Sequence, residues 1–266
     1  MADDGARIAA VYDASAPAYE QHWGPALLPH ARDLLSLLAP VDGPRRILEV
    51  ATGTGSLLPD LVRAAGAGGS VVALDRSLGM LRRVTAPVPL AQADALALPV
   101  RSGSVDVVVA AFVLFLLPDA HRGAVEIGRV LRPGGELVAA TWGEQRETRA
   151  EELLLEALDE AGAPEPQGVA RSDADTDSPT ALRTLLESAG LADVRTDARR
   201  LDARFTPAAM LEMRTACGNT GWRFAQLDDA RQAEVRAQLA RRYARLDEDA
   251  FTDTSEVLLT YARRPD

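Results

Sequence analysis

Short apolar runs alternate with helical patterns through the first half of the chain. Runs typical of buried strands span residues 46–51, 70–75, 88–91, 106–111 and 136–142. Apolar residues at helical spacing follow at 56–65, 77–84 and 119–130. Strands that alternate with helices in this order are typical of a parallel sheet covered by crossover helices. The pattern therefore predicts an α/β fold built around a Rossmann-like sheet.

The second half of the 266-residue chain is less regular. A helix is predicted at 150–161, and the Pro, Asp and Ser content of residues 162–180 favours a mobile loop. Ser178 and Pro179 are typical of the start of a helix, which runs to residue 189. Strands are expected at 191–199 and 250–263, and helices from 207, at 227–246, at 6–20 and at 26–38. The helices thus add to the sheet at the N-terminus and between the last two strands.

The charge of the chain excludes several classes of function. Its 29 basic residues are all arginine, and 39 acidic residues bring the formal charge to −10. An acidic chain is a poor partner for nucleic acid, and without lysine it has no Schiff-base or P-loop lysine chemistry. Cys217 is the single cysteine, so neither an intrachain disulfide nor a cysteine-rich metal cluster is expected. The three histidines also lack metal-ligand spacing, so we expect no metal.

The longest apolar run, residues 107–117, is about half of the ~20 residues that a membrane span needs. The chain begins with acidic residues where a secretory signal would be basic and then apolar. We therefore expect a cytoplasmic protein with no membrane partner. Its oligomeric state, monomer or homodimer, is left open.

Residues 47–56 (ILEVATGTGS) predict a strand, a turn with two glycines and the start of a helix. Such glycines let the backbone approach a ligand closely, although a turn without a ligand would use them too. A dinucleotide fingerprint needs a third glycine where this chain has Leu58, which disfavours NAD and FAD. Asp75 follows the second strand, where a carboxylate accepts ribose hydroxyls, and Asp94 follows the third strand.

Several motifs in this order resemble the class I S-adenosylmethionine-dependent methyltransferases, in particular the small-molecule subgroup similar to the ubiquinone and menaquinone C-methyltransferases. The motifs are YDASAPAYEQHW, LEVATGTG, VVALDRSLGML, QADALALPVRSGSVDVVVAAFVLFLLPD and RVLRPGGELVAATW. The resemblance covers residues 12–142 well and the remainder only in outline. It implies a mostly parallel seven-stranded sheet with an antiparallel last strand. The implied parts are an N-terminal helical lid (1–40), a cofactor-binding core (41–200), a helical cap (201–249) and the final strand (250–266).

The resemblance also implies a set of residues around S-adenosylmethionine and its product, S-adenosylhomocysteine. Those on the methionine, ribose and adenine sides are Tyr19, Glu49, Ala51, Gly53, Gly55, Asp75, Arg76, Met80, Asp94, Ala95, Ala111 and Phe112. Ala51 departs from the glycine that the family most often has there.

The aromatic residues that should reach the carboxyl edge of the sheet predict a pocket for a planar or apolar acceptor. The predicted acceptor-pocket residues are Tyr12, Trp23, Phe115, Trp142, Trp222 and Arg223. Trp222 and Arg223, beside the glycine-rich residues 218–221, are interpreted as a flexible rim of the pocket.

The catalytic group stays open. Phe115 and Leu116 replace a polar or histidine pair that is common in the family, which removes the obvious general base. His22 is the better remaining candidate, because His121 is expected on the surface or at a helix cap and His30 in a structural role. We expect catalysis mainly by positioning and desolvation, with a base needed only for a poorly acidic acceptor.

The sequence thus favours methyl transfer to an O, N or C nucleophile of a small organic acceptor, either a secondary metabolite or a quinone-like ring. Two alternatives remain open. One is a fold relative that binds the same cofactor but catalyses decarboxylation or cyclisation, and the other is a non-catalytic binding protein.

Overall fold

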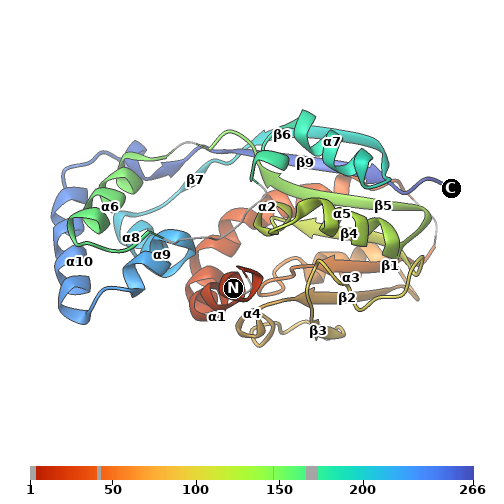
Figure 1. The fold of residues 1–266 in the computed structure, drawn as a ribbon, viewed down its shortest axis with the longest axis horizontal. Coiled ribbons are helices and arrows are strands. Elements are labelled where there is room, and N and C mark those ends of the chain that lie inside the picture. The colour runs from red at the N-terminus through yellow and green to blue at the C-terminus, as the bar shows by residue number, and fades with distance from the viewer. Residues whose placement is uncertain (1–3, 41–42, 146, 166–172) are drawn as a thin grey trace.

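The computed structural model describes residues 4–40, 43–145, 147–165 and 173–266. A seven-stranded sheet lies at its centre, with the strand order β3-β2-β1-β4-β5-β9-β6 (Figure 1). The strands are β1 (Arg46–Val50), β2 (Ser70–Asp75), β3 (Leu90–Gln92), β4 (Val105–Ala111), β5 (Leu131–Trp142), β6 (Ala192–Arg200) and β9 (Glu256–Arg263). The first five pair in parallel, whereas β9 is antiparallel to β5 and β6. The predicted sheet is confirmed.

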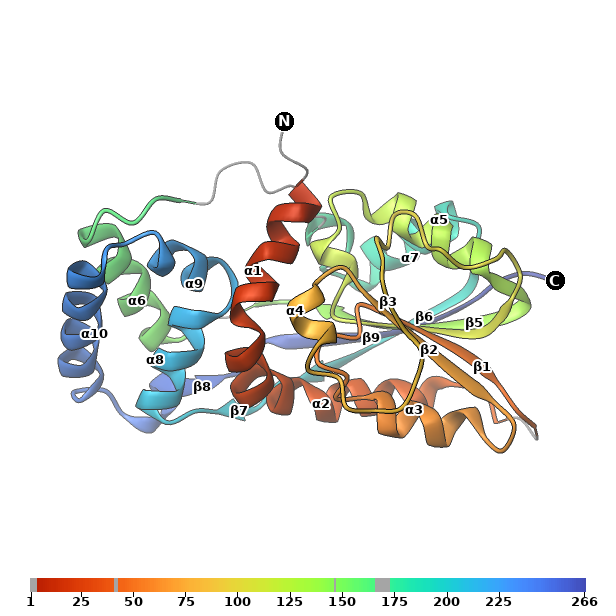
Figure 2. The same ribbon diagram turned by 90° about the horizontal axis from the view of Figure 1, so that it is seen from below.

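Both faces of the sheet are covered because successive residues of a strand point to opposite sides. Leu48 and Val108 belong to a buried cluster with α5 (Ala120–Val130) and α7 (Pro179–Ser188). Their neighbours Ile47 and Val107 belong to a second cluster with α2 (Gly24–Asp33) and α3 (Leu58–Ala65). Figure 2 shows the two pairs of helices on opposite sides of the sheet. This burial explains why β1 and β4 are almost continuously apolar.

The N-terminal segment is nearly one continuous helix rather than the two separate helices predicted. It consists of α1 (Asp4–Ala18), the π-helical segment η1 (Tyr19–Trp23), α2 and the 3₁₀ turn η2 (Leu34–Leu37). The π-helical segment lies just before Pro25, whose missing N–H interrupts the regular hydrogen-bond ladder. Figure 2 shows α1 between the sheet and the helices at the far end of the molecule.

Those far helices form the cap. They are α6 (Arg149–Glu160), α8 (Pro207–Ala216), α9 (Gly218–Ala225) and α10 (Asp229–Tyr243). Leu154 and Leu158 of α6 share a buried cluster with Met210, Phe224 and Leu239. Helix α6 therefore packs with the cap although it precedes α7 and β6 in the chain. The division into lid, core, cap and final strand stays a prediction. The prediction included α6 in the core (41–200), whereas in the structure α6 packs with the helices of the cap.

Several predicted bounds are wrong. Strand β5 already begins at Leu131, where it pairs with Val105 across a register shift, and α4 (Leu78–Leu81) is a single turn. The last strand begins only at Glu256, because the residues before it form the 3₁₀ turn η5 (Glu248–Phe251) and β8 (Thr252–Asp253), which pairs with β7 (Ala203–Arg204). Two further 3₁₀ turns are η3 (Leu114–Leu116) and η4 (Asp173–Asp175). Residues 166–172 of the predicted loop lie outside the described residues.

The glycine-rich residues 218–221 are helical and form the start of α9, which also contains Trp222 and Arg223. A Cβ atom at Gly221 would lie 2.5 Å from the backbone carbon of Ala216. The glycine therefore lets α9 pack closely against the end of α8.

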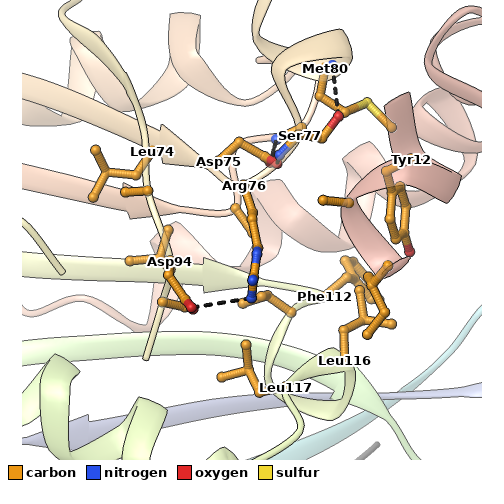
Figure 3. Close-up of a pocket in the computed structure, with 18 of the residues that line it drawn as sticks. Tyr12, Leu74, Asp75, Arg76, Ser77, Met80, Asp94, Phe112, Leu116 and Leu117 are labelled. Carbon is orange, nitrogen blue, oxygen red and sulfur yellow. Dashed lines mark hydrogen bonds and ion pairs between the residues drawn. The ribbon is translucent and has the colours of Figure 1, made fainter. Parts of the chain in front are cut away.

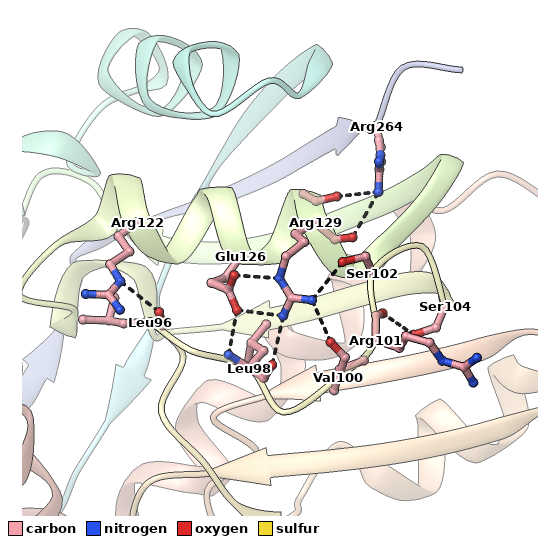
Figure 4. A network of polar contacts seen from close by, with 11 residues as sticks. Leu96, Leu98, Val100, Arg101, Ser102, Ser104, Arg122, Glu126, Arg129 and Arg264 are labelled. Atoms are coloured by element: carbon pink, nitrogen blue, oxygen red, sulfur yellow. Dashed lines mark hydrogen bonds and ion pairs between the residues drawn. The ribbon is translucent and has the colours of Figure 1, made fainter.

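A polar network fixes the segment between β3 and β4 (Figure 4). Arg129 of α5 donates hydrogen bonds to Glu126 and to the carbonyl oxygens of Leu98 (2.9 Å) and Val100 (2.8 Å). The Glu126 carboxylate in turn accepts from the Leu98 N–H at 2.8 Å. The segment that includes Asp94 is thus tied to α5.

No helix within the described ranges is long and apolar enough to span a membrane.

Candidate active site

A cavity with about 850 Å³ of empty space opens at the carboxyl ends of β1, β2 and β4. Ten of the twelve predicted cofactor-binding residues line it: Tyr19, Ala51, Gly53, Asp75, Arg76, Met80, Asp94, Ala95, Ala111 and Phe112. The others, Glu49 and Gly55, lie behind this lining. We call this space the first cavity. Its place at the carboxyl edge of a parallel sheet is where such folds bind ligands.

The turn after β1 has an unusual backbone. Ala51, Gly53 and Gly55 have φ angles of 59°, 57° and 78°. A Cβ atom at Gly55 would lie 2.9 Å from Leu58 and 3.0 Å from Val84, so the close packing of these side chains needs a glycine at this position. Phe112, just after β4, also has a φ of 59°. Two non-glycine residues therefore hold the left-handed conformation at the edge of the same cavity, which costs free energy.

Asp75 at the end of β2 ties the turn to the next strand. Its carboxylate accepts 2.8 Å hydrogen bonds from the N–H groups of Gly53 and Ser77. Burial raises the pKa of Asp75, although these backbone hydrogen bonds oppose the shift. Because each carboxylate oxygen accepts more than one hydrogen bond, Asp75 keeps acceptor capacity for a pair of hydroxyl groups.

Arg76 reaches across the first cavity toward Asp94 (Figure 3). Its Nη1 atom lies 3.2 Å from Asp94 Oδ2, while Asp94 Oδ1 accepts a 2.9 Å hydrogen bond from the N–H of Leu96. Figure 3 shows Tyr12, Phe112 and Leu116 gathered at the opposite end of the cavity. The first cavity thus has a polar end at Asp94 and an aromatic end at Tyr12.

Two ionisable groups lie beside the turn, of which Glu49 is buried and Tyr19 is partly exposed. Glu49 is 3% exposed and accepts a hydrogen bond from the hydroxyl of Thr52. Burial raises the pKa of Glu49 to about 8, more than this hydrogen bond lowers it. Burial also raises the pKa of Tyr19, and its ring carbon Cε1 would be 3.8 Å from a Cβ at Gly53. A buried carboxyl group behind the turn suits a ligand that carries positive charge.

Helix α1 is fastened over the first cavity. Asp13 Oδ1 accepts 2.6 Å hydrogen bonds from the hydroxyl of Ser77 and from the N–H of Gly79. Glu20 accepts a 2.6 Å hydrogen bond from Nε of Arg83. The sequence marks Ser77 as a helix N-cap, since a serine precedes the apolar residues of α4, but nothing local indicates that Asp13 binds there.

A second cavity, with about 1520 Å³ of empty space, lies between the core, α1 and the cap. Five of the six predicted acceptor-pocket residues line it: Tyr12, Trp23, Phe115, Trp142 and Trp222. Ile8, Tyr12 and Leu116 line both cavities, so the two spaces meet there. The ring centroids of Phe112 and Trp142 are 5.2 Å apart and connect the two linings.

The second cavity also has a polar part that the sequence does not predict. Its polar lining includes Gln145, Glu147, Glu151, Arg214, Asp253 and Ser255. Arg214 contacts Glu151 of α6 and lies 3.4 Å from Asp253 of β8, so residues from three distant segments meet. Glu151, Arg214 and Asp253 are each ordinary charged residues within their own segments. No local sequence pattern predicts that they meet.

Two predicted residues lie elsewhere. Arg223 lines neither cavity; its buried guanidinium contacts Asp159 at 2.5 Å and Glu165 at 2.7 Å. The role of Arg223 in an acceptor pocket is therefore corrected, since these acids draw the side chain into the cap. His22 also lines neither cavity, and its Nε2 atom lies 3.2 Å from Glu212 of α8. His121 lies on the surface with Nε2 at 3.4 Å from the carbonyl oxygen of Ser188.

Comparisons with known proteins agree with this geometry. A family model described as "Methyltransferase domain" matches residues 48–139. The demethylmenaquinone methyltransferase of Renibacterium salmoninarum is 35% identical over 162 residues, which cover 57% of this chain and 67% of that protein. The enzyme of the same name from Thermus thermophilus is 40% identical over 108 residues, covering 38% of this chain and 49% of that protein. The chain therefore spans about half the length of this second relative.

Solved structures share the fold at lower identity. A phosphoethanolamine N-methyltransferase of Haemonchus contortus, in complex with S-adenosylhomocysteine, has a TM-score of 0.57 at 17% identity and covers 96% of this chain and 58% of that chain. The structure described as the [4+2]-cyclase SpnF has a TM-score of 0.53 at 21% identity and covers 89% of this chain and 81% of that chain. The similarity to these two structures supports the fold only and does not assign a function. Together with the family model and the curated relatives, the cavity at the sheet edge establishes that this chain belongs to the class I S-adenosylmethionine-dependent methyltransferases.

Proposed function

We propose that the protein transfers a methyl group from S-adenosylmethionine, held in the first cavity, to a small organic acceptor in the second. The observation that carries this proposal is that the two cavities meet at Ile8, Tyr12 and Leu116. A donor on one side of this junction and an acceptor on the other would have their reacting atoms next to each other.

The residues of the first cavity fit this cofactor. The carboxylate of Asp75 has the acceptor capacity for the two ribose hydroxyls, and Asp94 lies at the far polar end for the adenine amino group. The buried carboxyl group of Glu49 would lie on the side of the methionine and its sulfonium, where a bound positive charge would favour its ionised form. When bound, S-adenosylmethionine supplies a methyl group that its sulfonium has already activated. Arg76 and Met80 would pack on the adenine side, and Ala111 and Phe112 would border the reacting end.

The protein itself then has to position the acceptor and exclude water. Helix α1 contributes Ile8, Ala9 and Tyr12 to the lining of the first cavity, and Ile8, Tyr12 and Leu116 line both cavities. A dry, closed site favours the transfer because charge is neutralised as the methyl group moves. Burial raises the pKa of the Cys217 thiol in the second cavity to about 11, so it is protonated at neutral pH. Positioning and desolvation thus remain the main contributions that we assign to the protein.

The acceptor is proposed as a secondary metabolite or a quinone-like ring that presents an O, N or C nucleophile. The curated relatives named demethylmenaquinone methyltransferase support the quinone-like form. We also propose a cytoplasmic location for the protein.

Calorimetric titration with S-adenosylmethionine and S-adenosylhomocysteine tests the cofactor. Both ligands should bind, and Asp75→Asn should bind about 10–100-fold more weakly, because it loses a hydrogen bond to a charged group. Asp228→Asn is the matched control, since Asp228 caps α10 and asparagine caps helices equally well. A folded protein that binds neither ligand would refute the proposal. Accumulation of S-adenosylhomocysteine with an acceptor then demonstrates transfer.

A further inference from the structure

Three side chains border both cavities, and they come from two elements that lie far apart in the sequence. Ile8 and Tyr12 belong to α1, and Leu116 belongs to the 3₁₀ turn η3. All three are half-buried, and Ile8 and Leu116 are aliphatic. We call these three the boundary side chains. In the proposed reaction the transferred group has to pass between them, because the two spaces meet there.

Helix α1 runs along the boundary between the two cavities. Ile8 and Tyr12 are four residues apart, so their side chains lie on the same face of the helix. Of their neighbours, Ala9 lines the first cavity and Val11 lines the second. The face that carries Ile8 and Tyr12 therefore separates the two spaces, and Figure 2 shows α1 between the sheet and the cap.

The turn η3 places its three side chains in three different surroundings. A 3₁₀ helix has three residues per turn, so successive side chains point about 120° apart. Leu114 is fully buried in the core, Phe115 lines the second cavity, and Leu116 borders both cavities. A 2.9 Å hydrogen bond from the N–H of Leu116 to the carbonyl oxygen of Val113 supports this arrangement.

Both sides of the boundary are held in place. Helix α1 is tied to α4 through Asp13, whose carboxylate accepts two hydrogen bonds of 2.6 Å. On the other side, the N–H of Phe112, just before η3, donates a 2.8 Å hydrogen bond to the carbonyl oxygen of Ala140 on β5. Packed side chains that are held in this way resist the insertion of even one extra methylene group.

We propose, on the basis of the methyl transfer proposed above, that Ile8 and Leu116 determine which alkyl groups the sulfonium of the cofactor can carry. The two aliphatic side chains leave room for a methyl group at the boundary and exclude a longer alkyl chain. Contacts with the adenosine and the methionine are the same for every alkyl group, so they cannot supply this selection. One additional methylene in an apolar site is typically worth about 10–200-fold in discrimination.

Calorimetric titration with three ligands tests this selection without an acceptor. S-adenosylhomocysteine carries no alkyl group to be transferred, S-adenosylmethionine carries methyl, and S-adenosylethionine carries ethyl with the same charge. The wild type should bind S-adenosylethionine about tenfold or more weakly than S-adenosylmethionine. Leu116→Ala and Ile8→Ala should each reduce this difference to within about threefold. Both variants should bind S-adenosylhomocysteine within about threefold of the wild type, because it places no alkyl group between the boundary side chains.

Leu155→Ala is the matched control. Leu155 is also half-buried, and it lines the second cavity but not the first. The same truncation at this position should therefore leave the ratio between the affinities for S-adenosylmethionine and S-adenosylethionine at its wild-type value.

The outcomes are distinct. If the wild type binds S-adenosylethionine as tightly as S-adenosylmethionine, the boundary does not select by size and the inference is wrong. It is also wrong if either Leu116→Ala or Ile8→Ala keeps the wild-type ratio, or weakens all three ligands equally, which is the effect of lost structural support. If the wild type binds neither S-adenosylmethionine nor S-adenosylhomocysteine, the proposed methyl transfer itself fails, and this inference fails with it.

Discussion

Asp13 of α1 packs directly on Gly79 of α4. The N–H of Gly79 donates a 2.6 Å hydrogen bond to Asp13 Oδ1, and a Cβ atom at Gly79 would lie 2.8 Å from the Cα atom of Asp13. The contact therefore needs both the carboxylate and the missing side chain. It holds α1 over the first cavity, where α1 contributes Ile8, Ala9 and Tyr12 to the lining.

Gly79→Ala should loosen this closure. Overpacking costs about 1–3 kcal/mol, and α1 relieves it by moving away, so affinity for S-adenosylhomocysteine should fall about tenfold or more. Calorimetry gives the affinity, and hydrogen exchange should show faster opening of residues 4–18.

Gly128→Ala is the control for that variant. Gly128 is also helical, but a Cβ there meets its nearest neighbour at an ordinary 3.6 Å. Alanine should stabilise the helix by up to about 1 kcal/mol and leave affinity unchanged. Equal affinities of the two variants would show that α1 does not have to pack closely on α4.

Ala51→Gly should raise stability slightly. The left-handed backbone of Ala51, with a φ of 59°, costs a residue with a side chain roughly 1–2 kcal/mol of folding free energy, and glycine avoids this cost. Glycine also has greater freedom in the unfolded chain, which cancels about 0.5–1 kcal/mol of that gain. Urea unfolding should show a gain of up to about 1 kcal/mol. Ala111→Gly, at the end of β4 in the same cavity, lacks the positive φ and should lose about 0.5–1 kcal/mol. A similar loss in both would mean that Ala51 carries no strain.

Glu49 should make stability depend on pH. Its pKa is about 8 in the folded protein and about 4.3 in an unfolded chain. Between these values the folded protein keeps a proton that the unfolded chain releases. The stability from neutral Glu49 is therefore complete below about pH 4 and is lost as the pH rises through about 8.

Thermal unfolding of wild type and Glu49→Gln from pH 5 to 9 measures this effect. The wild type should lose stability relative to the variant as the pH rises. Asp75, whose pKa burial also raises, is present in both proteins, so the difference reports the proton of Glu49 together with its coulombic coupling to Asp75. Parallel pH profiles would show that Glu49 is ionised throughout the range.

His22→Gln should leave turnover almost unchanged. A general base contributes about 10²–10⁴-fold to rate, whereas His22 pairs with Glu212 and lines neither cavity. With an acceptor that turns over, kcat should stay within about threefold, as it should for His121→Gln on the surface. A loss of about a hundredfold for His22→Gln alone would identify it as the base after all.

The sequence determined the local parts of this protein. The strand, turn and helix from β1 into α3 and the position of Asp75 at the end of β2 follow from local patterns of glycine and apolar residues. The hydrogen bond from the Gly53 N–H to Asp75, by contrast, joins residues 22 positions apart. The alternating buried faces of β1 and β4 likewise predict the layered sheet, since a strand buried on both faces has to be apolar throughout.

Only the tertiary structure decided which side chains from distant segments meet. Glu151, Arg214 and Asp253 come together because α6 packs into the cap and β8 lies at its base. Arg223 turns away because Asp159 and Glu165 attract it from α6 and the segment that follows. Asp13 contacts Gly79 only because α1 packs over α4 in the folded protein. Such contacts depend on long-range packing that no local pattern records. The cofactor side and the aromatic lining of the second cavity were therefore predictable, while the polar contacts of the second cavity were not.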